Sequence, residues 1–293
     1  MTVVEDATDL ISPRARRRRL LRKRLARRPF ALLGFAVAAT FILAAIFAPW
    51  VAPYSASATD FNAVLAKPSW DHLLGTDELG RDILSRIIWG ARASIQAGVL
   101  ATCLAMAIGV PIGLVAGYYR GWVDPVISRV TDVVLAFPFL ILAVGLAAIM
   151  GPSLLNATIA LGVGAAPGFV RVARGETLAL REEDYVRVAI ANGAGDATII
   201  FRHIVPNMTS TLLVQATVTI PAAIIGEAVL SFLGLGVQPP TPSRGVMLAD
   251  AQSYLSQAPR LAVYPGLAIV IASLAFNVLG DGLRDTFDPR TTR

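Results

Sequence analysis

Few side chains in this sequence have the type and spacing that catalysis or metal binding requires. The only cysteine, Cys103, cannot form a disulfide framework or a thiolate metal site. The serines of "GPS" and "TPS", Ser153 and Ser243, have no base near them in the sequence. No GxxxxGK[ST] phosphate-binding loop occurs, and "GVGAAPG" (Gly162–Gly168) lies inside an apolar run rather than after a strand. We therefore predict that this chain is not an enzyme and itself binds no cofactor or metal.

One acidic residue, Glu227, lies between two stretches without charge, Ile204–Gly226 and Ala228–Ser243. An acid at membrane depth is costly, and it usually faces a bundle interior or water. Two interpretations stay open. Glu227 contacts a translocation path or a neighbouring subunit, or it is a structural acid that pairs with a backbone group or a partner helix.

The distribution of charged residues along the chain predicts the helices that hold Glu227 and the other residues named above. The chain has 293 residues, of which 55% are hydrophobic and 16% are charged. A membrane-spanning helix needs about 20 mostly apolar residues, and the uncharged runs lack the polar face of a soluble helix. We predict an all-α, polytopic membrane protein with six transmembrane helices: Phe30–Ala52, Gln96–Gly117, Val126–Met150, Leu154–Arg171, Thr209–Leu233 and Ala262–Gly280.

Lysine and arginine residues predict the orientation of these spans. Most of the 26 fall before the first span, between spans 2 and 3, between spans 4 and 5, or after the last. Cytoplasmic loops carry this excess of positive charge. Both termini are therefore expected to be cytoplasmic, with Pro53–Ile95 and Gly234–Leu261 outside. His72 and His203 then lie on opposite sides of the membrane and cannot share a metal.

The basic stretch Arg14–Arg28 could indicate a nucleic-acid partner. Because it directly precedes a span, it is better interpreted as a positive-inside anchor that contacts anionic lipid headgroups. The following apolar run, Phe30–Ala52, is longer than the apolar region of a cleaved signal peptide. We predict a retained first span, membrane lipid as a partner and no nucleic acid.

The segment between spans 4 and 5 is unusually charged for this chain. In Arg181–Asn207, the residues Tyr185, Val188 and Ala189 recur at helical spacing, which gives a short helix one apolar face. Acidic residues occupy its first turn, where the helix dipole favours them. Gly193 follows, as a helix end requires. The pattern fits either an ordinary amphipathic linker or a surface that docks on a folded partner.

The same segment resembles the cytoplasmic loop of ABC importer permeases, with its pattern Glu-Ala-Ala, three residues, Gly, nine residues, Ile-x-Leu-Pro. Aligned on Gly193, Arg187–Ala189 stands at the first triplet and His203–Pro206 at the end. Arg187 replaces the leading Glu and His203 replaces the Ile. With these two departures the segment resembles the peptide-transporting branch of the family, in which "RHxxPN" is the usual ending.

Two further stretches resemble the C-type permeases of dipeptide and oligopeptide importers. "LLGTDELGRDILSRIIWGAR" (Leu73–Arg92) is similar to their external segment before the second span. "EAVLSFLGLGVQPPTPSRG" (Glu227–Gly245) is similar to their segment between spans 5 and 6, except that Arg244 stands where the family usually has Trp. The resemblance divides the chain into a basic tail (1–29), a first helix with an external segment (30–90), a permease domain (91–285) and a C-terminal tail (286–293).

The resemblance implies a type I ABC importer permease fold in a bacterial cell membrane. It implies a heterodimer with a second permease, two ATP-binding subunits or one fused ATPase, and an extracytoplasmic substrate-binding protein. ATP and Mg would be bound by the ATPases. It also makes the coupling loop (172–208) the segment that docks on an ATPase. The implied coupling residues are Glu183, Asp184, Tyr185, Val188, Ala189, Gly193, Ala194, His203 and Pro206.

Two alternatives to peptide import remain open from the sequence. The three motifs do not separate peptide importers from related permeases that carry nickel, glutathione or another small solute. From a different class, a secondary transporter would need its own coupling acids at mid-membrane, and Glu227 is the only candidate.

The expected topology can be tested by labelling with a membrane-impermeant thiol reagent in intact cells. In a Cys103→Ala background, Ser57→Cys should be labelled and Thr292→Cys should not, because the first position is expected outside and the second inside. Labelling of position 292 alone would reverse the orientation.

Overall fold

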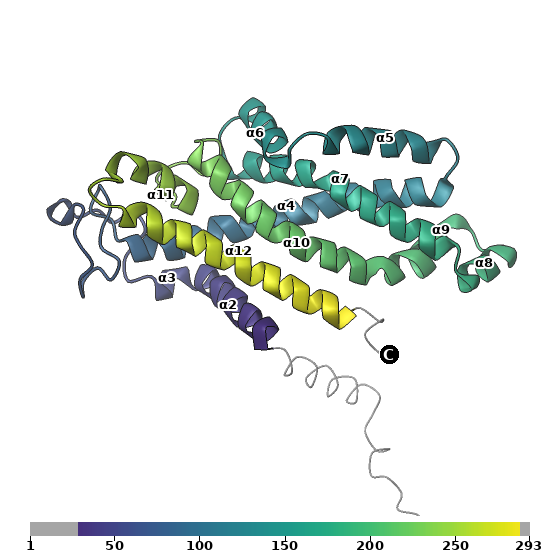
Figure 1. Ribbon diagram of the computed structural model, residues 1–293, viewed down its shortest axis with the longest axis horizontal. Coiled ribbons are helices and arrows are strands. Elements are labelled where there is room, and N and C mark those ends of the chain that lie inside the picture. The colour runs from purple at the N-terminus through teal and green to yellow at the C-terminus, as the bar shows by residue number, and fades with distance from the viewer. Residues whose placement is uncertain (1–28, 288–293) are drawn as a thin grey trace, which may run out of the picture.

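The computed structural model describes residues 29–287, and among these it is almost entirely helical, which confirms the all-α class (Figure 1). The long helices are α2 (Pro29–Ile46), α4 (Ile83–Tyr119), α5 (Val123–Leu135), α6 (Phe139–Met150), α7 (Leu154–Arg181), α10 (Val205–Phe232) and α12 (Arg260–Phe287). The short elements are α3 (Ala48–Val51), η1 (Phe61–Ala63), α8 (Asp184–Ala191), α9 (Asp196–Thr198), the π-helix η2 (Ile199–Ile204), α11 (Arg244–Ala251) and η3 (Gln252–Tyr254).

The predicted count of six spans is not confirmed within the described residues. Four helical stretches there are long and apolar enough to cross a membrane: Ile83–Tyr119, Leu154–Arg181, Asp196–Phe232 and Arg260–Gly280. The described apolar part of α2, Leu32–Ile46, is shorter than a full span. Helix α4 begins 13 residues before the predicted Gln96 boundary. At about 1.5 Å per residue it is about 55 Å long, so it extends well beyond the hydrocarbon layer.

The predicted third span, Val126–Met150, is two helices, α5 and α6, bent by 87°. The bend lies at Phe137–Pro138, because proline has no N–H to continue the helix and disfavours helical geometry in the residue before it. Counted as one span, the bent pair is a fifth candidate. Helix α5 lies along α7, and Asp132 pairs there with Arg171 at 2.9 Å. The apolar run alone did not indicate this break.

Helices α4 and α7 form the closest helix pair of the bundle. Gly109, Gly113 and Gly117 repeat every four residues along one face of α4. A Cβ atom at Gly113 would lie 2.5 Å from the carbonyl oxygen of Val170 and 2.7 Å from the Cβ of Ala173. Small residues let membrane helices approach closely enough for backbone van der Waals contact. This stripe therefore sets the separation of α4 and α7.

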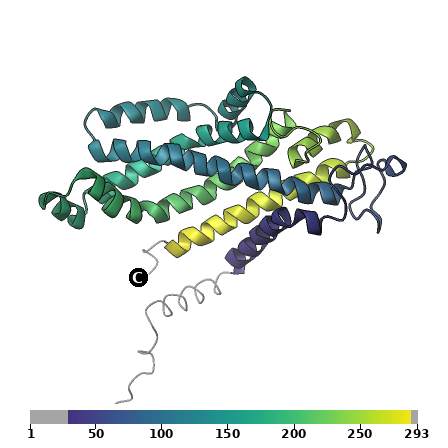
Figure 2. The same cartoon turned by 180° about the vertical axis from the view of Figure 1, so that it is seen from behind.

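The other long helices surround this pair. Helix α10 packs against α4, α7 and α12, while α2 lies beside α12 (Figures 1 and 2). Helices α8 and α9 lie at one end of the bundle, called here the coupling end. Helices α3 and α11 and the segment 52–82 lie at the other, called here the opposite end. Sequence segments 52–82 and 182–204 are thus separated by the length of the bundle.

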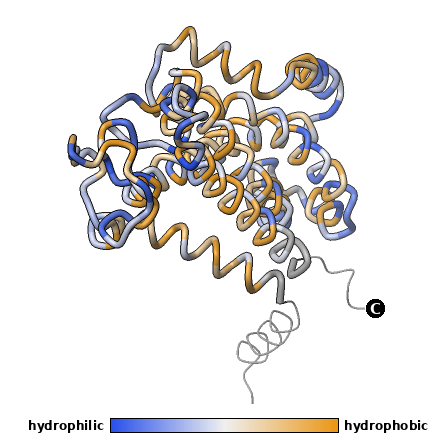
Figure 3. Tube along the Cα trace, turned by 60° about the vertical axis from the view of Figure 1, so that its left-hand side comes forward, coloured by the Kyte–Doolittle hydropathy of each residue, from blue (hydrophilic) through white to orange (hydrophobic). Residues whose placement is uncertain are grey.

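The outer surface of the helices is apolar, as a lipid environment or a partner helix requires. Figure 3 shows hydrophobic residues along the helical tubes, with hydrophilic residues gathered mainly in the connecting segments. Exposed large side chains occur on several helices, for example Leu100, Val133, Ile141 and Leu274. Soluble monomers rarely expose apolar surface of this extent, so these faces are expected to contact lipid or another subunit.

The α4–α7 stripe gives a prediction about stability. Gly113→Ile should destabilise the protein by about 1–3 kcal/mol or more, because overpacking forces apart two backbones already in contact. We expect a lower yield of monodisperse protein after detergent extraction and a lower thermal midpoint.

Gly145→Ile in α6 is the matched control, since no other atom lies within 4 Å of a Cβ atom built at Gly145. Equal thermal midpoints for the two variants would show that the stripe does not set the helix separation.

Candidate functional site

The predicted coupling residues lie together at the coupling end (Figure 1). Glu183 is the N-cap residue of α8, and Asp184 lies in its first turn. Pro206 lies in the first turn of α10. His203, in η2, places its ring 6.2 Å from the ring of Tyr185, centroid to centroid. The ring contact joins the two halves of the coupling loop.

Gly193 ends α8 in the left-handed conformation expected from the sequence, with φ of 79°. Its N–H donates to the carbonyl of Ile190 at 2.9 Å, and the N–H of Ala194 donates to the carbonyl of Ala189 at 3.1 Å. This pair of bonds is a Schellman motif, which satisfies carbonyls that the helix end would leave free. The turn gives α8 a defined end and reverses the chain toward α9.

A buried anchor holds the coupling loop on the bundle. Val186, Ile199 and Ile204 are at most 1% exposed. They belong to a core cluster with residues of α4, α7 and α10, among them Phe169 and Met208. Full burial of a side chain of this size contributes roughly 1.5–3 kcal/mol. The loop is therefore packed onto the helix ends rather than tethered to them.

The outer side of the coupling loop is apolar and exposed. Tyr185 is 42% exposed, Val188 58%, Ile190 42% and Phe201 72%. Ala189 is partly buried. Exposed aromatic and aliphatic side chains grouped on a fixed element are typical of a protein-binding surface.

Polar contacts fix the loop to the end of α4. Glu182 accepts hydrogen bonds from Arg187 at 2.6 Å and from Arg120 at 2.5 Å. The hydrogen bond from Arg187, followed by the hydrogen bond and charge of Arg120, holds the pKa of Glu182 below its usual range. The Tyr118 hydroxyl donates to Asp196 at 2.8 Å, and Arg181 donates to the Tyr118 carbonyl at 2.5 Å. A displacement of the loop must therefore move the end of α4 with it.

Sequence reasoning missed two side chains of this region. Val186 was not distinguished from its neighbours, although it alone in α8 is buried. Phe201 was overlooked because η2 is a π-helix, in which the α-helical spacing used to assign faces does not hold. The bulky Phe201 in a charged segment is the one signal that could have indicated an exposed contact residue.

Glu227 of α10 is fully buried at the opposite end of the bundle. Its carboxylate accepts hydrogen bonds from the hydroxyls of Ser94 (2.9 Å), Ser231 (2.7 Å) and Ser243 (3.1 Å). Ser243 is also the N-cap residue of α11. The acid thus joins α4, α10 and α11.

Arg244 is fully buried beside this cluster. None of its guanidinium nitrogens has a hydrogen-bond acceptor among residues 29–287. The guanidinium carbon lies 4.6 Å from the centre of the Phe41 ring, on α2. Burial lowers the pKa of Arg244 to about 10, and the nearby Glu227 opposes this shift. The aromatic face of Phe41 and the nearby carboxylate of Glu227 therefore both favour the charged form of Arg244.

The motif Leu73–Arg92 folds largely on itself. Asp77, buried, accepts hydrogen bonds from the backbone N–H groups of Leu79 and Arg81, both at 2.9 Å. Its carboxylate also pairs with Arg81 at 2.7 Å and with Arg86 at 2.5 Å. Asp82 is the N-cap residue of α4. The motif is therefore the structural start of α4.

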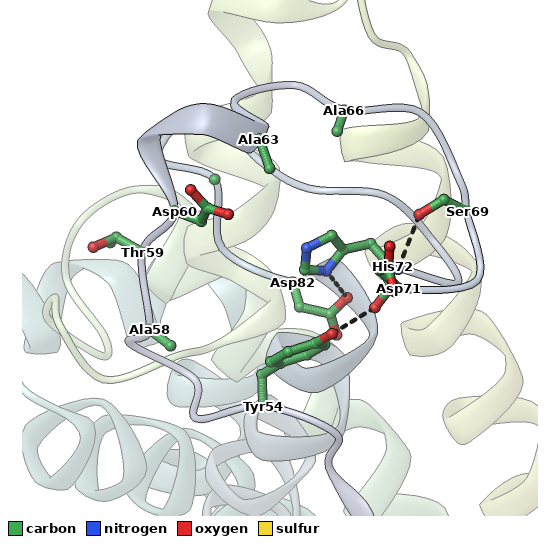
Figure 4. Close-up of a pocket in the computed structure, with 11 residues that line it drawn as sticks. Tyr54, Ala58, Thr59, Asp60, Ala63, Ala66, Ser69, Asp71, His72 and Asp82 are labelled. Atoms are coloured by element: carbon green, nitrogen blue, oxygen red, sulfur yellow. Dashed lines mark hydrogen bonds and ion pairs between the residues drawn. The ribbon is translucent and has the colours of Figure 1, made fainter.

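A pocket of about 450 Å³ lies in segment 52–82 (Figure 4). The His72 ring donates from Nδ1 to the Asp82 carboxylate at 3.1 Å, and the Tyr54 hydroxyl donates to the Asp71 carbonyl at 2.8 Å. Asp60 and Asp71 also line it, and no lysine or arginine does. Among the described residues no group of three His, Cys, Asp or Glu side chains could hold a metal. The pocket is an acidic hollow, called here the acidic pocket.

The chain belongs to the family of binding-protein-dependent transport system inner membrane components, whose model matches residues 109–293. Residues 17–68 match the N-terminal transmembrane domain of oligopeptide transport permease C. The protein is therefore a membrane-embedded transport permease rather than an enzyme.

Two relatives are similar over most of the chain. The dipeptide transport system permease protein DppC of Alkalihalophilus pseudofirmus is 44% identical over 92% of this chain and 88% of the relative. The glutathione transport system permease protein GsiD of Escherichia coli is 45% identical over 92% and 89%. A chain of the inward-facing methionine ABC transporter MetNI shares the fold, with a TM-score of 0.57 at 20% identity over 69% of this chain and 95% of that one.

The serine cluster predicts how Glu227→Gln behaves. In place of the second carboxylate oxygen the amide offers an N–H donor, so one serine must change from donating to accepting, and the negative charge beside Arg244 is lost, at a cost of about 1–3 kcal/mol. We expect less assembled complex in the membrane, while uptake per assembled complex stays near wild type. Normal assembly with reduced uptake would instead assign Glu227 to the translocation path.

Proposed function

We propose that this chain is the permease subunit of an ABC importer for dipeptides or oligopeptides. With a second, homologous permease it forms the membrane path, in a bacterial cell membrane with both termini in the cytoplasm. Partner subunits bind ATP and Mg and hydrolyse ATP, and an extracytoplasmic binding protein delivers the substrate.

The coupling loop carries this proposal. Its outer face presents Tyr185, Val188 and Phe201 to solvent, while its inner face is locked into the helix ends through Val186. A surface that is exposed and rigidly held can transmit a displacement, whereas a flexible loop would absorb it. An ATPase docked there would move the ends of α4, α7 and α10 as one body, which suits rigid-body switching between two states.

The substrate class is inferred from the relatives. A dipeptide permease and a glutathione permease are about equally similar to this chain over the same length. Both substrates are short and carry free carboxylates and an ammonium group. Binding of a peptide library, glutathione and nickel to the partner binding protein separates peptide import from the nickel and glutathione alternatives.

A secondary transporter is the alternative from a different class. Such a protein needs ionisable groups in the path that bind the coupling ion. Glu227 is buried and bonded to three serines, an arrangement that offers no open ion site. A secondary transporter would also have no use for the exposed apolar face of the coupling loop.

The proposal predicts that the coupling loop can be uncoupled without loss of the permease. Ala189→Trp fills space beside the outer face, and Gly193→Val forces a β-branched residue into positive φ, at about 1–3 kcal/mol. We expect near-normal membrane levels of both permeases. Co-purification of the ATPases should weaken, or ATP hydrolysis should continue without uptake.

Gly195→Val is the matched control for strain, because Gly195 has an ordinary φ of −69° and, like Gly193, no atom within 4 Å of an added Cβ. Ala15→Trp in the basic tail controls for the added bulk. If both loop variants import at the wild-type rate and keep their ATPases fully bound, the loop is an ordinary linker and not the coupling element.

A further inference from the structure

A second pocket, of about 440 Å³, lies at the opposite end of the bundle. Its walls come from three connections that meet there: the start of segment 52–82, the start of α7 at Leu154, and the loop 240–242 before α11. The fourth wall is the face of α4 that carries Trp89, Arg92 and Gln96. It is called here the Arg92 pocket. Its volume lies within the range of small-molecule sites, about 300–1,000 Å³.

Arg92 is the one charged side chain lining this pocket. Its guanidinium group lies 5.1 Å from the centre of the Trp89 ring. Nε donates to the carbonyl of Ala45 at 2.8 Å and Nη2 donates to that of Ile46 at 3.4 Å, at the end of α2. No carboxylate among residues 29–287 pairs with Arg92, and its Nη1 makes no hydrogen bond there.

The remaining polar groups of the pocket are neutral. The hydroxyl of Thr241 and the amide of Gln96 can each donate a hydrogen bond. The hydroxyls of Ser55 and Ser57 lie 3.4 Å apart and bond to each other, which leaves one of the two free to donate. Alanine, leucine and proline side chains, with the Trp89 ring, make up the rest. A fixed cation, several neutral donors and apolar walls favour a small oxyanion attached to an organic body.

The acidic pocket shows the opposite preference. Ser57 lines the Arg92 pocket and the next residue, Ala58, lines the acidic pocket. One segment, Tyr54–Asp60, which turns at Ala56 and Ser57, therefore separates a positively charged hollow from a negatively charged one. An oxyanion is repelled by Asp60, Asp71 and Asp82 on one side of this segment and attracted by Arg92 on the other.

We propose that the Arg92 pocket binds the terminal carboxylate of a short peptide. Arg92 Nη1 donates to the carboxylate, Gln96 and the nearby hydroxyls donate to its oxygens, and the peptide body lies against Trp89 and the proline loop. The inference rests on the proposed function for the kind of substrate, and it adds a site on this chain that the peptide meets at the mouth of the bundle.

Binding is tested with the purified full complex in nanodiscs without the binding protein. The probes are the dipeptide Ala-Ala and its C-terminal amide. Their binding is measured by saturation-transfer difference NMR. We expect Ala-Ala to bind and the amide to bind about tenfold or more weakly, since the charge-assisted hydrogen bond is lost. Arg92→Gln should weaken Ala-Ala binding similarly, whereas Arg92→Lys should retain most of it.

Two variants separate the site from the capping role of Arg92 at α2. Gln96→Leu removes a pocket donor without touching α2, and should weaken Ala-Ala binding about two- to fivefold. Lys67→Gln, which removes an exposed cation of segment 52–82 outside both pockets, should bind Ala-Ala as the wild type does. Equal binding by wild type, Arg92→Gln and Gln96→Leu would overturn the inference.

A lipid phosphate offers the same oxyanion chemistry. Nanodiscs of phosphatidylcholine alone are therefore compared with nanodiscs that also contain phosphatidylglycerol. Ala-Ala binding that is equal in both supports a peptide site. The pocket would instead be a lipid site if Ala-Ala and its amide bind equally weakly and phosphatidylglycerol is retained only when Arg92 is present.

Failure of the proposed function and failure of the Arg92 site give different experimental results. If the wild-type complex with its binding protein imports no peptide into proteoliposomes, the proposed function fails. If the wild type imports peptide and Arg92→Gln imports and binds it equally well, the proposed function stands and the Arg92 pocket is not a peptide site.

Discussion

The close approach of α4 and α7 is the contact on which the rest of the bundle depends. In a membrane the hydrophobic effect does little to hold helices together, so backbone-to-backbone packing must do so. Gly109, Gly113 and Gly117 permit it along the half of α4 nearest the coupling end. The core cluster that seats Val186 is built on the same two helices. The position of the coupling loop therefore depends on the stripe of glycines that brings α4 and α7 together.

The two ends of the bundle differ in whether their polar residues are exposed or buried. At the coupling end, exposed ion pairs such as Glu182–Arg120 are worth little by themselves, and the buried Val186 anchor does most of the positioning. At the opposite end the polar groups are buried. The Glu227 carboxylate accepts hydrogen bonds from three serine hydroxyls, and the Asp77 carboxylate pairs with two arginines. Removing one member of such a network leaves the others unpaired, so this end is rigid.

This division fits a device whose two ends receive different partners. A rigid opposite end keeps the acidic pocket and the Arg92 pocket in shape on either side of one chain segment. A coupling end whose outer surface is apolar can dock on a folded subunit. Helix α4, about 55 Å long, connects them: it begins in the Asp77 network, and in its last turn Tyr118 contacts the coupling loop.

The sequence by itself determined the membrane class, the all-α fold and the helix end at Gly193, because each follows from charge spacing or from local backbone chemistry. It did not determine the break between α5 and α6 or the early start of α4, since apolar composition does not set where a helix begins. Only the tertiary structure brought Ser94, Glu227 and Ser243 together. It alone also separated the buried Val186 from the exposed Phe201. Such contacts join residues far apart in the chain, and they are decided by how helices pack rather than by any local period.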